Sequence, residues 1–151
     1  MTLPQIRASL SAEDTESVGE ELARSILNDP SLPRFVALFG DLGVGKTAFV
    51  RGFTKQIAPT ARVKSPTFAL VNEYKGALCS VFHFDMYRIE DEDELYSIGF
   101  YDYADRNGII LTEWSENVKY ALPDAYLRVE LIKDDPASVD SRRIEITGVG
   151  I

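Results

Sequence analysis

The pattern of apolar residues predicts several β-strands along the chain. The runs Phe35–Phe39 and 109–112 are almost wholly apolar, which is typical of strands covered on both faces of a sheet. Elsewhere apolar and polar residues alternate, as in strands with only one buried face. These other predicted strands are an edge strand at 3–10, a hairpin of 67–74 and 78–85, and two closing strands at 125–132 and 142–147.

Helices are predicted between these strands. Ser11 and Asp14 form a pattern like a capping box, and apolar residues then recur every four positions until the chain reaches Pro30. A second helix is predicted over Lys46–Ile57, because its apolar residues fall on one face and Pro59 follows. Shorter helices are predicted near Leu95, at 101–105, and at 115–122 with Ser115 as the cap. The alternation predicts an α/β fold whose sheet is partly parallel, partly antiparallel, and flanked by helices.

Length and composition favour one globular domain over residues 1–151. Hydrophobic residues make up 45% of the chain and charged residues 26%, as in ordinary globular proteins. The single cysteine, Cys79, excludes an internal disulfide and a multi-cysteine zinc site, and we expect it to be a small buried apolar residue. With no signal peptide and no apolar run of about 20 residues, we expect a cytoplasmic protein that does not span a membrane.

The charge distribution argues against strong nucleic-acid binding by this chain alone. It has 16 basic and 24 acidic residues, a net charge of −8, whereas such binding depends on neutralising phosphates. Residues 42–72 nevertheless contain five basic residues and no acid, while residues 85–105 contain eight acids and only Arg88. A positive block of this kind favours an anionic ligand. The acidic run 90–94, by itself, is more typical of a solvated surface.

A phosphate-binding loop is the strongest chemical signal in the sequence. It matches G-x-x-x-x-G-K-S/T in full, between a predicted buried strand and a predicted helix. In such a loop the glycines let successive N–H groups point at phosphate oxygens, the lysine holds the β- and γ-phosphates, and the hydroxyl binds Mg²⁺. The sequence therefore predicts that ATP or a similar nucleotide binds at Gly40-Asp41-Leu42-Gly43-Val44-Gly45-Lys46-Thr47.

Two acids at predicted strand ends are candidates for catalysis. Glu113 follows an apolar strand, as a Walker B carboxylate does, and Asp85 shares a strand face with His83. We expect His83, the only histidine, to be a hydrogen-bonded structural residue rather than a zinc ligand. Thr67, in the segment 65–67, is a candidate for sensing the γ-phosphate. Trp114 fits either the rim of the pocket or the core.

These residues belong to five ordered blocks, and with them the chain resembles the TsaE (YjeE) family of bacterial P-loop ATPases. The resemblance covers nearly the whole chain. The blocks are the loop 40–47, residues 63–71 with Glu73-Tyr74, His83-Phe84-Asp85-Met86-Tyr87-Arg88, Glu94-Leu95 with Gly99 and Tyr103, and Thr112-Glu113-Trp114-Ser115. Ala48 departs from the pattern, because the family commonly has a second threonine there.

The resemblance implies a function and a set of site residues. It implies a P-loop NTPase-like fold and a small ATPase that uses Mg²⁺ and acts in threonylcarbamoylation of adenosine 37 of tRNA, with TsaB and TsaD as partners. ATP hydrolysis would reset that complex between turnovers. The implied roles are phosphate binding for Lys46, Mg²⁺ binding for Thr47 and Glu113, catalysis for Asp85 and Thr67, and positions near the nucleotide for Thr15 and Arg142.

Two other functions compatible with a P-loop are a small-molecule kinase and a nucleotide-gated docking module. A kinase usually has a lid bearing arginines, and only Arg88 and Arg106 lie between Asp85 and Gly108. A docking module would hydrolyse ATP only incidentally, so its turnover would not respond to partners. A GTPase is disfavoured, because the chain has no Asn-Lys-x-Asp motif for reading guanine. The candidate docking surfaces are the acidic segment 90–96 and the aromatic segment 99–103.

Overall fold

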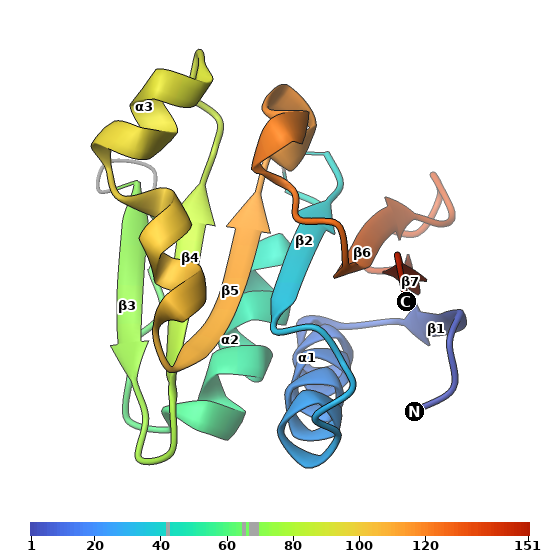
Figure 1. Cartoon of the computed structure of the whole chain (residues 1–151). Helices are drawn as coiled ribbons and strands as arrows, with labels where there is room; N and C mark the ends of the chain where they lie inside the picture. The colour runs from blue at the N-terminus through green and yellow to red at the C-terminus, as the bar shows by residue number, and fades with distance from the viewer. Residues whose placement is uncertain (42, 65, 67–69) are drawn as a thin grey trace.

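The computed structural model describes residues 1–41, 43–64, 66 and 70–151. Seven strands of this described part form one sheet in the order β1-β7-β6-β2-β5-β4-β3 (Figure 1). The strands are β1 (Gln5–Ser9), β2 (Phe35–Phe39), β3 (Val71–Lys75), β4 (Ser80–Asp85), β5 (Gly108–Glu113), β6 (Tyr126–Lys133) and β7 (Arg142–Val149).

The sheet is mixed, as predicted. Strands β4, β5, β2 and β6 run parallel to one another at its centre, whereas β3, β7 and β1 are added antiparallel at the two sides. The buried strands β2 and β5 pair directly, with Leu38 opposite Glu113. The carboxyl ends of β2, β4 and β5 therefore meet at one edge of the sheet, the upper edge in Figure 1.

Helices cover both faces of this sheet (Figure 1). One face carries α1 (Ala12–Asn28) and α2 (Lys46–Ile57), and the other carries α3 (Glu92–Ser97) with the 3-10 turn η1 (Phe100–Asp105). The core is correspondingly divided into two clusters. The larger packs Phe49 and Phe53 of α2 against the sheet, and the smaller surrounds Phe84 and Phe100.

Helices α1 and α2 pack closely because each presents a glycine to the other. A Cβ on Gly52 would lie 1.9 Å from the carbonyl oxygen of Glu16, and one on Gly19 would lie 2.3 Å from that of Phe49. Such distances are far below van der Waals contact, so these backbones approach each other only where no side chain intervenes. This packing holds α2, and with it the loop before α2, in a fixed position against the sheet.

Most predicted elements are confirmed, including the hairpin, the edge strand and the helix from Lys46 to Ile57. Ser11 caps α1 by accepting a hydrogen bond from the Asp14 amide. Cys79 is buried, as expected. The first part of the predicted strand 67–74 is outside the described residues. Within the described residues, no helix combines the length and apolar character required to cross a membrane.

The predicted helix at 115–122 is wrong. The chain instead makes two short 3-10 turns, η2 (Ser115–Asn117) and η3 (Lys119–Ala121), separated by Val118 in a non-helical conformation. Ser115 is not a cap, because its buried hydroxyl lies 2.5 Å from the hydroxyl of Thr112 and is hydrogen-bonded to it. Trp114 precedes the first turn with a φ of +63°. A tertiary contact therefore overrides the local capping pattern.

Candidate nucleotide-binding site

The glycine-rich loop joins the end of β2 to the start of α2, as predicted. Gly40, Gly43 and Gly45 have φ angles of +144°, +78° and +111°, values that L side chains rarely adopt. At Gly40 a Cβ would also lie only 2.7 Å from the carbonyl oxygen of Leu131. Leu42 is outside the described residues. The loop is thus a backbone cradle at the amino end of a 12-residue helix, where N–H groups and the helix dipole favour an anion.

Lys46 points its amine back over this loop. The residue is only 6% exposed, and its Nζ donates a hydrogen bond of 2.8 Å to the carbonyl oxygen of Gly40. The same Nζ lies 3.9 Å from the centroid of the Trp114 ring. Trp114 in turn packs edge-on against Tyr87 at 5.3 Å, so it lies beside the lysine at the edge of the site. Thr47 follows at the first turn of α2 with an exposed side chain.

The two predicted acids lie side by side at the carboxyl ends of neighbouring parallel strands. Asp85 and Glu113 are register partners on the parallel strands β4 and β5. Asp85 is buried, and its Oδ1 accepts a hydrogen bond of 2.9 Å from the Tyr87 amide. Glu113 is partly buried and its Oε2 lies 2.5 Å from Nε2 of His83. The expectation that His83 is a hydrogen-bonded residue is confirmed.

A cleft of about 480 Å³ lies beside the loop, and residues of β6 and β7 form part of its lining. Arg142, at the start of β7, lines this cleft, and its Nε donates a hydrogen bond of 2.9 Å to the carbonyl oxygen of Val44. Its Nη1 also donates to the carbonyl oxygen of Val139 at 2.7 Å. Arg142 therefore lies at the phosphate loop, and its expected place near the nucleotide stays a prediction. The residues lining the cleft are Gly40, Asp41, Gly43, Val44, Glu130, Leu131, Ile132, Lys133 and Arg142.

Thr15 also lies near the loop, beneath the start of α2. A Cβ on Gly45 would be 4.0 Å from the methyl group of Thr15. The Thr15 hydroxyl is buried and hydrogen-bonded to the hydroxyl of Ser9 at 2.7 Å. Its hydroxyl is thus tied to β1, while its methyl group faces the space beside Gly45.

The predicted γ-phosphate segment is only partly described. Ser65 and Thr67 lie outside the described residues, so the role expected for Thr67 stays a prediction. On either side of them the chain is anchored. The Tyr74 hydroxyl accepts from the Lys64 amide at 2.9 Å and donates to the Lys64 carbonyl oxygen at 3.0 Å. Beyond them, the Leu70 carbonyl oxygen accepts from the Asp85 amide at 3.0 Å. Sequence reasoning missed the anchoring by Tyr74, because a tyrosine four residues after Leu70 in a β-rich run does not indicate a hydrogen bond to Lys64.

Two of the five basic residues in the block 42–72 form ion pairs between α1 and α2. Arg51 is paired with Glu16 at 2.8 Å, and Lys55 with Glu20 at 3.7 Å, both across the α1–α2 contact. Lys46 instead lies at the loop, where its amine is hydrogen-bonded to Gly40.

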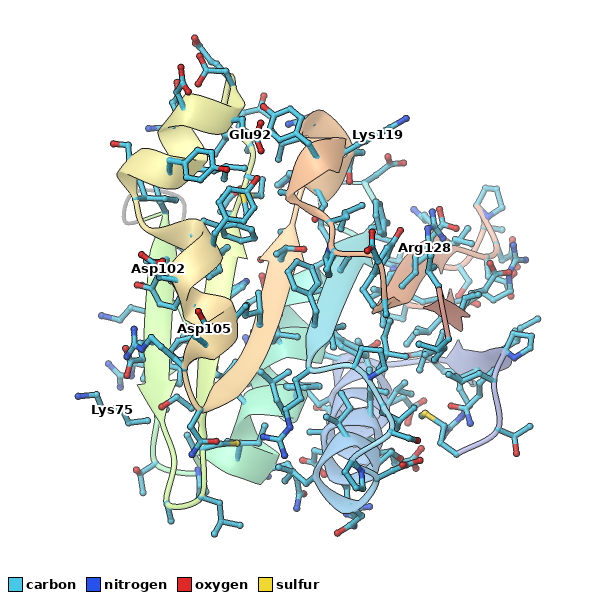
Figure 2. All side chains as sticks on the ribbon, viewed as in Figure 1. Lys75, Glu92, Asp102, Asp105, Lys119 and Arg128 are labelled. Atoms are coloured by element: carbon cyan, nitrogen blue, oxygen red, sulfur yellow. The ribbon has the colours of Figure 1, made fainter. Side chains whose placement is uncertain are left out.

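The acidic block lies on the opposite face of the sheet. Figure 2 shows Glu92, Asp102 and Asp105 pointing outward from α3 and η1. Asp91 caps α3, and the acids of its first turn suit the positive end of the helix dipole. Burial and a hydrogen bond to Glu92 raise the pKa of Tyr101 to about 12. Phe100 is buried in the smaller core cluster, so the aromatic segment 99–103 is partly core.

Comparisons with known proteins agree with this geometry. The model of the family described as threonylcarbamoyl adenosine biosynthesis protein TsaE matches residues 9–144. The tRNA threonylcarbamoyladenosine biosynthesis protein TsaE of Haemophilus influenzae is 43% identical over 74% of this chain and 68% of its own length. That of Bacillus subtilis is 37% identical over 76% of this chain and 70% of its own length.

A solved structure extends the likeness to three dimensions. The crystal structure of Bacillus subtilis YdiB superposes with a TM-score of 0.75 at 26% sequence identity, covering 99% of this chain and 88% of that one. The residues matched by the family model include the glycine-rich loop, and the structural match covers nearly the whole sheet. The chain therefore belongs to the TsaE family of threonylcarbamoyl adenosine biosynthesis proteins.

Proposed function

We propose that this member of the TsaE family is a Mg²⁺-dependent ATPase that supports a TsaB–TsaD complex in threonylcarbamoylation of tRNA. The observation that carries the proposal is the loop between β2 and α2, where three glycines have positive φ and Lys46 lies over the backbone cradle. A buried amine directed at a loop carbonyl is available to exchange that carbonyl for a phosphate oxygen, which offers it a stronger, charged acceptor.

The donor set also fits a magnesium ion. Thr47 offers an exposed hydroxyl at the start of α2, and Glu113 offers a carboxylate at the end of the neighbouring strand. Hard oxygen donors of this kind, with substrate phosphates and water, are the ligands that Mg²⁺ prefers. When bound, the metal neutralises charge that develops on the phosphates.

Hydrolysis requires a water molecule in line with the γ-phosphate. Its oxygen forms the new bond to phosphorus while the bond to the bridging oxygen of ADP breaks. Asp85 and Glu113 are the carboxylates at this edge that can orient the water and receive its proton. Lys46 stabilises the phosphate charge, and Arg142 holds the loop through Val44.

The acidic composition suits a protein that acts through partners. With a net charge of −8, this chain need not bind tRNA itself if TsaB and TsaD do. The exposed acidic face of α3 and η1 is one surface at which a partner can dock.

ATP hydrolysis by the purified chain with Mg²⁺, alone and with TsaB–TsaD, tests the proposal. We expect slow turnover alone and a strong increase with the pair. No increase with the pair, together with stimulation by a small-molecule acceptor, would instead identify a kinase. Turnover that responds to neither addition would identify a docking module.

A further inference from the structure

We propose that His83 is a positioning residue, whose Nε2–H holds one oxygen of Glu113 and thereby directs the other oxygen toward the metal and water side of the site. The inference deepens the proposed ATPase function, on which its catalytic part rests. The pairing itself is a feature of the nucleotide-free protein and can be tested there.

The pair is built into the sheet rather than formed at its surface. His83 is 1% exposed, and in the register of β4 and β5 it lies opposite Leu111, two residues before Glu113. Because side chains alternate along a strand, His83, Asp85, Leu111 and Glu113 share one face of the sheet. This geometry lets the imidazole reach forward along the sheet to the carboxylate, with 2.5 Å between Nε2 and Oε2.

The hydrogen bond has a defined direction. An ionised carboxylate only accepts, so the imidazole nitrogen that faces it must carry the proton. The other ring nitrogen, Nδ1, is buried and has no hydrogen-bond partner among the described residues. A buried N–H without an acceptor is costly, and Nδ1 is therefore the unprotonated nitrogen. The structure assigns the Nε2–H tautomer to His83.

This direction determines which part of Glu113 is available for chemistry. With Oε2 engaged by His83, Oε1 has no hydrogen bond to any other described residue. Carboxylates that bind metals are commonly oriented by such outer hydrogen bonds, and losing them typically costs about 10–100-fold in metal affinity or activity. Without His83, the carboxylate is free to rotate away from the loop.

Nitrogen NMR of histidine tests the tautomer without nucleotide or turnover. Because His83 is the only histidine, a spectrum of the full-length chain labelled with ¹⁵N-histidine contains one imidazole. We expect Nε2 to be the protonated nitrogen at neutral pH, and the Glu113→Ala variant to lose this preference. A protonated Nδ1 in the natural protein, or a spectrum that Glu113→Ala leaves unchanged, would overturn the proposal.

Two matched substitutions test positioning. In His83→Gln the amide nitrogen reaches about the place of Nε2, whereas in His83→Asn the same group is one methylene shorter and reaches only the place of Nδ1. We expect His83→Asn to lower kcat about tenfold and to raise the Mg²⁺ concentration needed for half-maximal turnover. In His83→Gln, both kcat and the Mg²⁺ concentration for half-maximal turnover should stay close to those of the natural protein. ATP affinity should change less than twofold in either variant.

Equal kcat and equal Mg²⁺ dependence in these two variants would contradict the proposal, since a merely structural histidine would not discriminate between them. Val81→Ala is the control, because Val81 lies on the same face of β4 and is fully buried but makes no polar contact. It should lower stability without changing the Mg²⁺ dependence. If the natural protein does not hydrolyse ATP, the ATPase proposal fails while the NMR result still decides the tautomer.

Discussion

The Nε of Arg142 donates a 2.9 Å hydrogen bond to the carbonyl oxygen of Val44, across 98 positions in the sequence. This bond ties the start of β7 to the middle of the phosphate loop. Because the proposed phosphate binding uses the loop's backbone N–H groups, a contact that restricts that backbone should lower the conformational cost of binding.

Replacing Arg142 with lysine should therefore weaken nucleotide binding while preserving the charge. A lysine amine cannot reproduce the Nε bond to Val44 together with the Nη1 bonds to Val139 and Ser141. We expect ADP and ATP affinity, measured by calorimetry, to fall about tenfold, equivalent to about 1.4 kcal/mol. Arg143→Lys is the control, since Arg143 pairs with Glu145 and Asp134 at the surface. Equal losses in both variants would rule out a specific role for Arg142.

Substitutions at the loop lysine and at the two acids should separate binding from turnover. Lys46→Ala should abolish nucleotide binding or turnover, because the phosphates lose their buried cation. Asp85→Ala and Glu113→Ala should leave binding near normal and remove turnover. Trp114 is the only tryptophan and lies 3.9 Å from Nζ of Lys46, so its fluorescence should change when nucleotide draws the amine away. Normal hydrolysis by Glu113→Ala would show that its assignment is wrong.

Adding one methyl group between the first two helices should destabilise the whole fold. In Gly52→Ala the new Cβ would lie 1.9 Å from the carbonyl oxygen of Glu16, so α1 and α2 must move apart. We expect a loss of about 3 kcal/mol in the free energy of unfolding and a Tm lower by roughly 6–12 °C. Thermal unfolding followed by circular dichroism measures both. Ser17→Ala, at an exposed position of α1, should change neither appreciably.

Removing the hydroxyl of Tyr74 should loosen the chain at the start of the segment 65–70. Tyr74→Phe leaves the Lys64 amide and carbonyl without their present partner, although the Asn72 side chain still donates to that carbonyl. The expected loss of stability is about 1 kcal/mol. Hydrogen exchange should show the Lys64 amide less protected, with the amides of α1 unchanged. If Lys64 exchanges as slowly as in the natural protein, the anchoring role assigned to Tyr74 is incorrect.

The contact of β1 with α1 should depend on pH. A hydrogen bond from Arg7 lowers the pKa of Glu21 in the folded state. This stabilisation is present above the unfolded pKa of about 4.3 and is lost as the pH falls through the lower folded value. Since both side chains are more than a third exposed, Glu21→Gln should cost only about 0.5 kcal/mol at pH 7. Chemical denaturation at pH 7 and pH 2 should show this difference disappear in acid, and a constant difference would contradict the assignment.

Local patterns were sufficient to predict most elements, and the exceptions show where they fail. The helix Lys46–Ile57 was predictable because its apolar face, its glycine-rich start and the following proline are all close in sequence. The helix expected from Ser115 does not form, because the hydroxyl that signals a cap is used by Thr112 in the interior. A capping residue works only if its side chain is free to turn toward the helix.

The sequence by itself determined which functional groups follow the buried strands. A glycine-rich loop follows one strand and an acid follows another, and each pattern lies within about ten consecutive residues. Only the tertiary structure decided which groups meet. In the fold, His83 is hydrogen-bonded to Glu113, Arg142 is hydrogen-bonded to Val44, and Gly52 packs against the backbone of Glu16. These contacts join residues 30 or more positions apart, and they depend on sheet register and on the close packing of helices. Neither sheet register nor helix packing can be predicted from the hydrophobic periodicity of a single segment.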